Sequence, residues 1–370
     1  MDGHSRPLKI LHLDPEKGWG GGERQVVGLL EYLSRRGHAN RLLCHPDGPL
    51  AAAARGMGIE VHPLAPANDL DFRAARRVGR LIREEGCDIV HFHTKRAHAL
   101  AAWLGGAADG PKRVVTRRMD YPIRRGWYDR FLYNRRVDGV VAISQPIAAL
   151  LAEGGVAREK IRVIHSGVAT APFENIPPPG DRSPLVIGTV AVLEERKGHR
   201  FLLEAAAELE RRGHRLKYRF AGDGAEKERL KKMAQNLQLS NDVEFLGFVS
   251  DVAGFLASID LFVLPSLFEG LGVAALEAMA AARPVVASKV GGLAELVVDE
   301  ETGALVPPGD GAALARAIAR FASDRELGRA MGERGRARVR DHFTMERMAR
   351  QNESYYYELL ENRAAIAAPR

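Results

Sequence analysis

The 370-residue sequence predicts an α/β protein of two domains in tandem, each built around a parallel β-sheet. Three observations support this fold class. Short runs of Val, Ile and Leu alternate with amphipathic stretches of helical length, which is typical of βα units and parallel sheets. The alternation stops in a segment rich in Pro and Gly, at residues 169–184, and then begins again. The length also suits two domains, at about 150 residues each.

The apolar runs define the expected strands. In the first half they lie at 8–13, 39–44, 59–62, 87–92, 113–116, 140–143 and 161–164, with helices expected between them, for example at 23–36 and 72–85. In the second half strands are expected at 185–192, 216–221, 243–246, 259–264, 284–287 and 303–306, and only helices from about 310 onward. The predicted organisation is a domain at 1–170, a linker at 171–184, a domain at 185–345 and a C-terminal helix within 346–370.

The positive charge is confined to the first half. The whole chain carries 54 Lys and Arg against 47 Asp and Glu, a formal net charge of +7. Residues 1–170 carry 27 basic and 18 acidic side chains, a net of +9, so the remaining 27 basic and 29 acidic residues sum to −2. Such asymmetry indicates an anionic partner, such as a membrane surface or a phosphorylated acceptor. Nucleic acid is disfavoured because no recognised binding motif accompanies the charge.

A basic segment with aromatic residues lies within that half. Residues 112–136 hold nine basic and two acidic residues, with Trp127 and Phe131 at helical spacing. This pattern is typical of a helix on a membrane surface, and the alternative is a domain helix that buries both rings. No run of about 18 apolar residues is present to span a membrane, and the start does not read as a signal peptide. We therefore expect a cytoplasmic protein with peripheral contact to the inner membrane face through 112–136.

A glycine-rich turn follows the first expected strand. Gly20, Gly21 and Gly22 precede Glu23 at the start of a helix. Glycine lets the backbone approach a ligand closely, and a helix N-terminus offers N–H groups to an anion. The alternative is a plain turn with Glu23 favourable in the first helical turn. The turn is not a G-x-G-x-x-G, and no acidic residue closes the second strand at Cys44, which disfavours dinucleotide binding.

Two charged segments of the second half point to a sugar diphosphate. Arg196 and Lys197 follow the first strand of that half, where a cation is well placed for a pyrophosphate, although this segment taken alone also fits a solvated loop. Glu269 precedes a helix and Glu277 lies inside it, eight positions later. Eight residues are slightly over two helical turns, so both carboxylates can face one side. Glu277 stands among apolar residues and needs a partner; the alternative is a helix cap and an exposed helical glutamate.

The ordered set of motifs resembles the retaining glycosyltransferases of family four, which have the GT-B fold of two Rossmann-like domains with parallel sheets facing across a cleft. The Glu-x7-Glu pattern inside the F-E-G-L-G segment carries the resemblance. Further matching segments occur in the family's order over nearly the whole chain, at 20–23, 88–93, 141–144, 164–168, 197–198, 220–224 and 245–247.

The resemblance implies roles on the donor side. Glu277 binds the ribose hydroxyls, Glu269 holds the donor sugar, and Lys197 neutralises the departing diphosphate. The implied donor-binding positions are Gly21, Gly22, Leu246, Phe248, Gly270, Leu271, Gly272 and Glu277. The family often has a second phosphate-binding cation five residues before the lysine, where this chain has Val192. We expect Arg196 to take that role and count it with Glu269 and Lys197 as catalytic.

On the acceptor side, the expected residues are His91, His93, Arg118 and Ser144. The family often has a histidine where this chain has Arg118, and arginine suits a phosphate or carboxylate on the acceptor. His91 and His93 alternate along a strand and point to one face. As a metal pair they lack a third ligand, so we expect a role at the acceptor end of the strand. The D-x-D of Asp69 and Asp71 precedes a helix and is interpreted as a cap.

The residues and the resemblance together predict a retaining, metal-independent glycosyltransferase. It would move a sugar from a nucleotide-diphosphate sugar, with UDP favoured, to an acceptor such as an anionic glycolipid or a lipopolysaccharide-type envelope glycan. The nucleotide sugar is a co-substrate, and neither a cofactor nor a metal is expected. The alternatives are an NAD-type oxidoreductase on a doubly wound fold, a nucleotide-sugar epimerase of the GT-B fold, and a noncatalytic nucleotide-sugar-binding protein. The donor sugar, the acceptor and the oligomeric state stay open.

Overall fold

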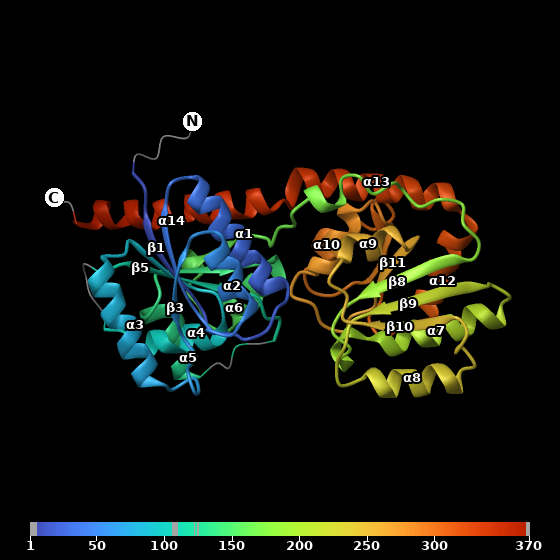
Figure 1. Cartoon of the computed structure of the whole chain (residues 1–370), viewed down its shortest axis with the longest axis horizontal. Coiled ribbons are helices and arrows are strands. Elements are labelled where there is room, and N and C mark those ends of the chain that lie inside the picture. Colours follow the sequence, from blue (N-terminus) through green and yellow to red (C-terminus); the bar gives the residue numbers. More distant parts are fainter. Residues whose placement is uncertain (1–5, 106–109, 122, 124–125, 368–370) are drawn as a thin grey trace. The chain divides into compact units, whose positions relative to one another are not determined.

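Two separate parallel β-sheets organise the chain (Figure 1). The computed structural model describes residues 6–105, 110–121, 123 and 126–367. It divides into two units: the first comprises the chain up to Gly167 together with the segment from Met345 onward, and the second comprises Val168–Thr344. The fold class predicted from the sequence, α/β with two parallel sheets, is confirmed.

The sheet of the first unit has seven strands in the order β3-β2-β1-β4-β5-β6-β7. Their bounds are β1 Lys9–Asp14, β2 Ala39–Cys44, β3 Glu60–Pro63, β4 Ile89–Phe92, β5 Lys112–Arg117, β6 Gly139–Ala142 and β7 Ile161–Val163. All neighbours pair in parallel. The chain builds outward from β1 in one direction and then, from β4, in the other. The carboxyl ends of β1 and β4 therefore form a topological switch point, where open α/β sheets bind ligands.

Helices cover both faces of this sheet. On one face lie α1 Gly21–Arg35, α2 Pro49–Gly56 and α14 Met345–Ala367, and on the other α3 Phe72–Glu85, α4 Lys95–Leu100, α5 Trp127–Arg135 and α6 Gln145–Glu153 (Figure 1). The apolar side chains of alternate strand residues, such as Ile10 and Ile89, pack against α1 and α14 in one buried cluster. Burial on both faces explains why central strands such as β6 are apolar in the sequence.

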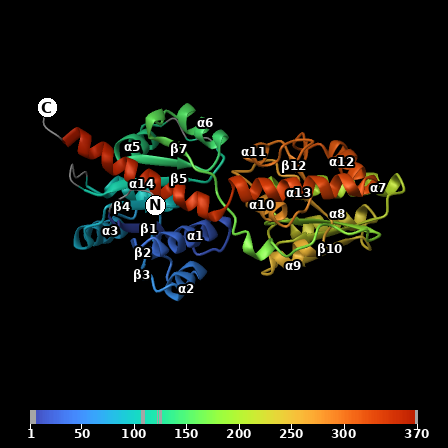
Figure 2. The same ribbon diagram turned by 90° about the horizontal axis from the view of Figure 1, so that it is seen from above.

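The final helix α14 belongs to the first unit although the second unit precedes it in the chain (Figure 2). Its three consecutive tyrosines each bond a different part of that unit. The hydroxyl of Tyr355 donates to the carbonyl of Lys160 at 2.9 Å, and the hydroxyl of Tyr357 donates to the carbonyl of Arg6 at 2.8 Å. The hydroxyl of Tyr356 lies 2.6 Å from Nδ1 of His91. Buried phenols need such partners, so this helix is fixed by specific bonds as well as by apolar packing.

The sheet of the second unit has six parallel strands in the order β10-β9-β8-β11-β12-β13. Their bounds are β8 Leu185–Val190, β9 Leu216–Ala221, β10 Val243–Gly247, β11 Leu261–Leu264, β12 Val285–Ser288 and β13 Gly303–Val306. The helices are α7 His199–Arg211, α8 Lys227–Asn236, α9 Val252–Ala257, α10 Val273–Ala280, α11 Leu293–Leu296, α12 Gly311–Ser323 and α13 Arg325–His342. The switch point here lies between β8 and β11.

Two sequence-based boundaries differ from the structure. The strand expected at 185–192 ends at Val190, because the next residues leave the sheet and the N–H of Leu193 bonds the carbonyl of Asp223 at 2.9 Å. The Pro-rich segment expected to be a linker packs on the second unit, where the Arg336 guanidinium bonds the carbonyl of Ile176 at 2.5 Å. A segment without periodicity can therefore still be ordered by side chains that bond its backbone carbonyls.

Candidate active site

In the second unit, the loops after β8 and β11 bring a lysine and a glutamate together at the switch point. Nζ of Lys197 lies 2.5 Å from Oε2 of Glu269, and each side chain is 12% exposed. Ser266 donates its hydroxyl to the same carboxylate oxygen at 3.3 Å. Lys197 and Glu269 lie 72 positions apart in the chain. They meet because the strands that precede them, β8 and β11, are neighbours in the sheet. The ion pair is therefore largely shielded from solvent at this end of the sheet.

Glycines allow these loops to approach each other. Gly198 has a positive φ of 67°, and a Cβ there would lie 2.0 Å from the carbonyl oxygen of Pro265. A Cβ on Gly291 would lie 1.8 Å from the carbonyl oxygen of Glu269. Because only glycine has no Cβ, the backbones of both loops can pack directly against the segment that carries the glutamate. The positions of Lys197 and Glu269 are thus set by backbone contact.

Glu277 lies on helix α10, which begins after Gly272, a residue with a φ of 99°. Gly270, Leu271 and Gly272 form the turn that connects Glu269 to this helix. Glu277 is 6% exposed and is the one charged member among the buried residues of α10. A buried carboxylate on an apolar helix costs stability unless polar groups meet it, and this residue has such an interaction.

An exposed apolar edge adjoins the same end of the sheet. Leu246 is 39% and Phe248 is 72% exposed. The end of β10, which carries Leu246, contacts the glycine loop after β9, where the N–H of Gly222 bonds the carbonyl of Gly247 at 2.7 Å. Gly222 also packs against Ala191. A Cβ at Gly222 would lie 1.8 Å from the carbonyl oxygen of Ala191. Apolar side chains exposed beside such loops suit a flat aromatic ligand.

Arg196 is placed differently from its neighbour. Its guanidinium bonds the carboxylate of Glu194 at 2.8 Å and its side chain is 48% exposed. The backbone carbonyl of Arg196 accepts from the N–H of Leu267 at 2.8 Å. The structure therefore joins the backbone of Arg196 to the Glu269 loop and turns its cation toward Glu194.

In the first unit, the glycine-rich turn opens α1 beside an arginine. A Cβ on Gly22 would lie 3.6 Å from the Arg118 side chain, and Gly21 is the first residue of the helix. Asp14, at the end of β1, is buried, and burial together with the charge of Glu23 raises the pKa of its carboxyl to about 7. Burial lowers the pKa of Arg118, and the carboxylates of Asp14 and Glu23 act in the opposite direction.

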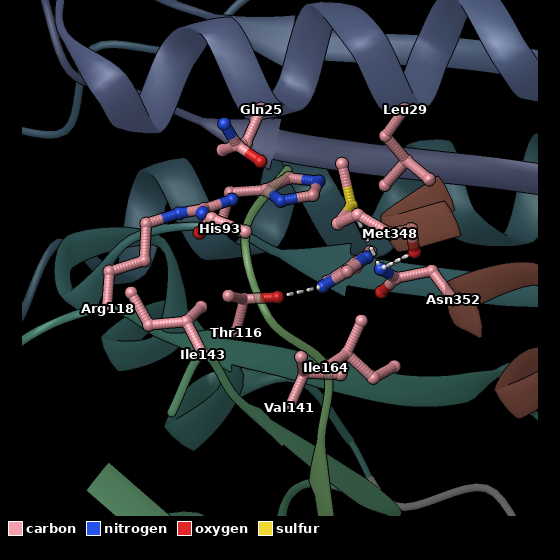
Figure 3. A pocket seen from close by; sticks show the side chains of 12 residues that line it. Gln25, Leu29, His93, Thr116, Arg118, Val141, Ile143, Ile164, Met348 and Asn352 are labelled. Carbon is pink, nitrogen blue, oxygen red and sulfur yellow. Dashed lines mark hydrogen bonds between the residues drawn. The ribbon is translucent and has the colours of Figure 1, made fainter. Parts of the chain in front are cut away.

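A small pocket lies under α1 and α14 on the same face of the sheet (Figure 3). It is lined by Gln25, Leu29, His91, His93, Thr116, Arg118, Val141, Ile143, Ile164, Ser166, Met348 and Asn352. Among the residues that the structure describes, Nδ1 of His93, Oγ of Ser166 and Oδ1 of Asn352 are buried polar atoms of this lining without a hydrogen-bond partner. Buried polar atoms are normally bonded, so the pocket is suited to a small polar ligand.

The predicted acceptor-side residues occupy two environments. His91 and His93 are buried, and burial lowers the pKa of both imidazoles well below the usual value, so the rings are neutral near pH 7. Both line the pocket together with Arg118. Ser144 is fully buried, and its hydroxyl caps α6 by accepting from the N–H of Ile147 at 3.5 Å. The expected cap at Asp71 is confirmed, since its carboxylate accepts from the N–H of Ala74 at 2.9 Å.

The sequence reasoning missed several polar residues of the first unit. His12 and Asp14 alternate on β1 and face the pocket side of the sheet, as their strand parity requires. Gln25 holds the backbone of Gly167 through two 2.8 Å hydrogen bonds, and Asn352 comes from the final helix. His12 and Asp14 could have indicated this site in the sequence, because they are polar residues that alternate at the carboxyl end of an otherwise apolar strand.

Comparison with known proteins identifies the family of this chain. Residues 174–338 match the family of glycosyl transferases group 1, and residues 19–171 match glycosyltransferase family 4. A relative that is 30% identical over 354 residues is the lipopolysaccharide core biosynthesis glycosyltransferase LpsE of Rhizobium meliloti, and the match covers 92% of this chain and 96% of that protein. The chain belongs to this glycosyltransferase family and has the GT-B fold.

Solved structures share the fold. The Anabaena protein HepE, crystallised in complex with UDP, superposes with a TM-score of 0.83 at 23% identity, over 95% of this chain and 100% of that one. A glycosyltransferase from Rickettsia africae superposes with a TM-score of 0.84 at 24% identity, over 97% and 100%. Membership in the family favours sugar transfer over the NAD-type oxidoreductase and the epimerase that the sequence left open. Among the described residues, no helix is both long and apolar enough to cross a membrane.

Proposed function

We propose that this protein is a retaining glycosyltransferase that takes its sugar from a UDP-sugar. The observation that carries the proposal is the pair of Lys197 and Glu269 at the switch point of the second sheet, 2.5 Å apart. A cation there suits a diphosphate, and a carboxylate beside it suits sugar hydroxyls. The exposed edge of Leu246 and Phe248 suits a nucleobase, and Glu277 a ribose. UDP is favoured because HepE, which shares the fold, binds UDP.

The proposed reaction needs no separate base. The bond between the anomeric carbon and the β-phosphate oxygen breaks while that oxygen takes the proton of the acceptor hydroxyl. The acceptor oxygen then bonds the anomeric carbon on the face that UDP leaves, so the configuration is retained. The ammonium of Lys197 offsets the negative charge that grows on the diphosphate, and such electrostatic stabilisation is the main catalytic effect. No metal takes part in this proposal.

We assign the acceptor to the first unit. Arg118 and the pocket beside His93 lie at the carboxyl ends of its strands. Arginine suits a phosphate or carboxylate, which supports an anionic acceptor such as a glycolipid of the cell envelope. The relative LpsE acts in lipopolysaccharide core biosynthesis, which agrees with such an acceptor.

Calorimetry tests the donor site. The full-length protein is titrated in chelator with UDP, GDP, ADP and NAD, as wild type and as Glu277→Ala. We expect UDP to bind best, and the substitution to weaken UDP about 10- to 100-fold, because hydrogen bonds to a charged group contribute roughly 1.5–3 kcal/mol. The matched control is Glu228→Ala, whose carboxylate is 76% exposed and should leave binding unchanged. Binding of NAD alone, or equal binding by Glu277→Ala, would refute the assignment.

The stereochemistry has its own test. Slow hydrolysis of UDP-glucose or another accepted α-linked UDP-sugar, with water as the acceptor, releases a free sugar whose first-formed anomer NMR can identify. We expect the α anomer before mutarotation. A β anomer would show inversion and remove the front-face reaction while leaving the donor site intact.

We further propose peripheral contact with the inner membrane face through 112–136. Trp127 opens α5 and is 79% exposed, whereas Leu132 and Tyr133 are the buried residues of this helix. An exposed tryptophan among arginines suits the headgroup region. Flotation with phosphatidylglycerol vesicles at low salt should retain the protein, and Trp127→Ala should reduce retention severalfold. Trp103→Ala, which removes a 52% exposed tryptophan outside this segment, is the control. Equal retention by both variants, or none by wild type, contradicts the proposal.

A further inference from the structure

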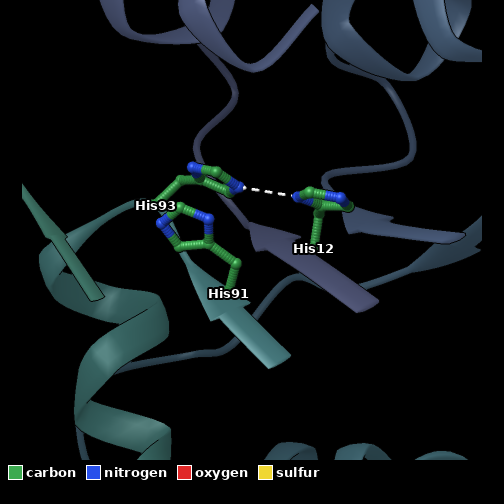
Figure 4. A group of neighbouring side chains, drawn as sticks. All are labelled: His12, His91 and His93. Atoms are coloured by element: carbon green, nitrogen blue, oxygen red, sulfur yellow. Dashed lines mark hydrogen bonds between the residues drawn. The ribbon is translucent and has the colours of Figure 1, made fainter. Parts of the chain in front are cut away.

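Three histidines meet at the switch point of the first sheet (Figure 4). His12 comes from β1, and His91 and His93 come from the end of β4. Each offers one ring nitrogen, and these nitrogens all lie within 4.8 Å of one another. Nδ1 of His12 lies 3.0 Å from Nε2 of His93. All three side chains are at most 2% exposed.

The sheet register explains how the three rings converge. His12 and His91 are paired neighbours of β1 and β4, so their side chains point to the same face. His93 follows two positions after His91 and returns to that face. In the sequence, His91 and His93 form a pair that lacks a third ligand. The parallel pairing of β1 with β4 supplies the missing one from about 80 residues earlier.

The surrounding hydrogen bonds orient two of these rings as metal ligands require. Ligating histidines usually bond their second nitrogen to an oxygen of the protein, which fixes the tautomer. Nε2 of His12 lies 3.2 Å from Oδ1 of Asn40, so this nitrogen carries the proton and Nδ1 is left with a lone pair. His91 lies between the hydroxyls of Tyr356, at 2.6 Å, and Thr116, at 2.7 Å. An ion can replace one hydroxyl while the other holds the ring.

The adjoining pocket provides for a further ligand. His91 and His93 line it together with Ser166 and Asn352, whose buried oxygen atoms have no hydrogen-bond partner among the described residues. Its free volume of about 10 Å³ suits one water molecule. Arg118 also lines this pocket. Its cation opposes a metal ion, and the nearby carboxylates of Asp14 and Glu23 offset that charge.

We propose that His12, His91 and His93 form a binding site for a divalent transition-metal ion of the zinc type, completed by a water molecule in the pocket. Imidazole nitrogens suit Zn²⁺, Cu²⁺ or Ni²⁺, whereas Mg²⁺ and Ca²⁺ prefer oxygen. Zinc–nitrogen distances of about 2.0–2.1 Å place tetrahedral ligands roughly 3.4 Å apart. The three nitrogens lie within 4.8 Å of one another, so the proposal requires the rings to move closer together when the ion binds. The ion joins β1 to β4 and stabilises the first unit, and the site does not depend on the proposed transfer reaction.

Binding to the full-length protein tests the site. Chelator-treated protein is titrated with Zn²⁺ by calorimetry, and with Co²⁺ by its visible absorption, which reports tetrahedral coordination. We expect one tight equivalent, a Tm that rises with Zn²⁺ concentration, and no effect of Mg²⁺. His12→Gln and His93→Gln should each weaken Zn²⁺ at least 100-fold. His62→Gln is the control, because that half-exposed ring pairs with Glu60 outside the trio.

One measurement needs no variant. X-ray absorption at the zinc edge of the wild-type complex should show three imidazole ligands near 2.0 Å, so the proposal stays testable if a variant fails to fold. The proposal is overturned if wild type binds no tight equivalent, if folded His12→Gln and His93→Gln bind as wild type does, or if the absorption spectrum shows fewer than three imidazoles.

Discussion

Replacing Lys197 with methionine tests the central charge of the proposed donor site. Methionine keeps most of the side-chain length and removes only the ammonium. Because both Lys197 and Glu269 are 12% exposed, solvent screens this charge weakly. Loss of one pre-positioned charge or donor at a developing anion typically lowers kcat by about 10²–10³, or roughly 3–4 kcal/mol. We therefore expect a loss of that size for Lys197→Met.

The same change also affects stability, which allows the two effects to be separated. Without Lys197, the carboxylate of Glu269 keeps one hydroxyl partner, Ser266, and loses its counter-ion. Removing one partner of a buried ion pair costs about 3–5 kcal/mol, whereas replacing both can be nearly neutral. The double variant Lys197→Met with Glu269→Gln should therefore recover most of the stability and none of the activity.

The assay measures UDP release from a panel of UDP-glucose, UDP-galactose and UDP-N-acetylglucosamine, together with urea unfolding of the same samples. The control is Lys231→Met, a lysine that forms a surface pair on α8. If Lys197→Met keeps kcat within about tenfold of wild type, the lysine does not stabilise the leaving diphosphate. If the double variant regains activity along with stability, the loss came from the unpaired carboxylate and the electrostatic argument is wrong.

Three further predictions concern backbone and titratable groups. Gly198→Ala should lower activity more than tenfold, because its Cβ would lie 2.0 Å from the carbonyl oxygen of Pro265, whereas Gly213→Ala, with a similar positive φ and open space, should cost only about 1 kcal/mol of strain in urea unfolding. Burial opposes ionisation of Glu353, but hydrogen bonds lower the pKa of its carboxyl on balance. It therefore stabilises the fold above pH 4.5 and less as the pH falls through the folded pKa. Glu353→Gln should cost about 2 kcal/mol at pH 7 and progressively less in unfolding below pH 4. The pKa of Asp14 is raised from 3.8 to about 7, so wild-type stability should fall as the pH rises between these values. Asp14→Asn should add up to about 4 kcal/mol at pH 8 and nothing near pH 4; a gain that does not change with pH would contradict the burial of an ionised Asp14.

The sheet of each unit could be predicted from the sequence because its central strands, such as β4 and β11, are buried on both faces. The run 216–221 is strand β9 and the run 303–306 is strand β13 without any shift. Strand ends were less predictable where loops cross over them. The run 185–192 includes Val192, which is apolar but 49% exposed beyond the end of β8. Apolar residues occur both in buried strands and on surfaces that face a ligand. An apolar residue just beyond a strand therefore does not show where the strand ends.

The candidate site was predictable only where its residues lie close together in the chain. Glu269 and Glu277 share one helix region and were found by their spacing. The contact of Lys197 with Glu269 depends on β8 lying beside β11, and the contact of His12 with His93 depends on β1 lying beside β4. Strand order is decided by how whole βα units pack, which local residue patterns do not encode. Resemblance to a family assigned Lys197 and Glu269 to one donor site, but the contact between them and the contact of His12 with His93 came only from the structure.

The two switch points place different chemistry in equivalent positions. In the second unit the loops after the two central strands carry opposite charges, Lys197 and Glu269, at a partly open edge. In the first unit the strand ends themselves carry His12 and His91, neutral because burial lowers the pKa of each ring. A diphosphate leaving group needs a fixed cation because its charge grows during the reaction. Neutral imidazoles can share protons with hydroxyls or bind a soft cation, and neither task needs a permanent charge. In the proposed sites, strand order therefore determines where a ligand binds. The residues at the carboxyl ends of the strands determine which kind of ligand it is: an anion in the second unit, and a neutral group or a metal ion in the first.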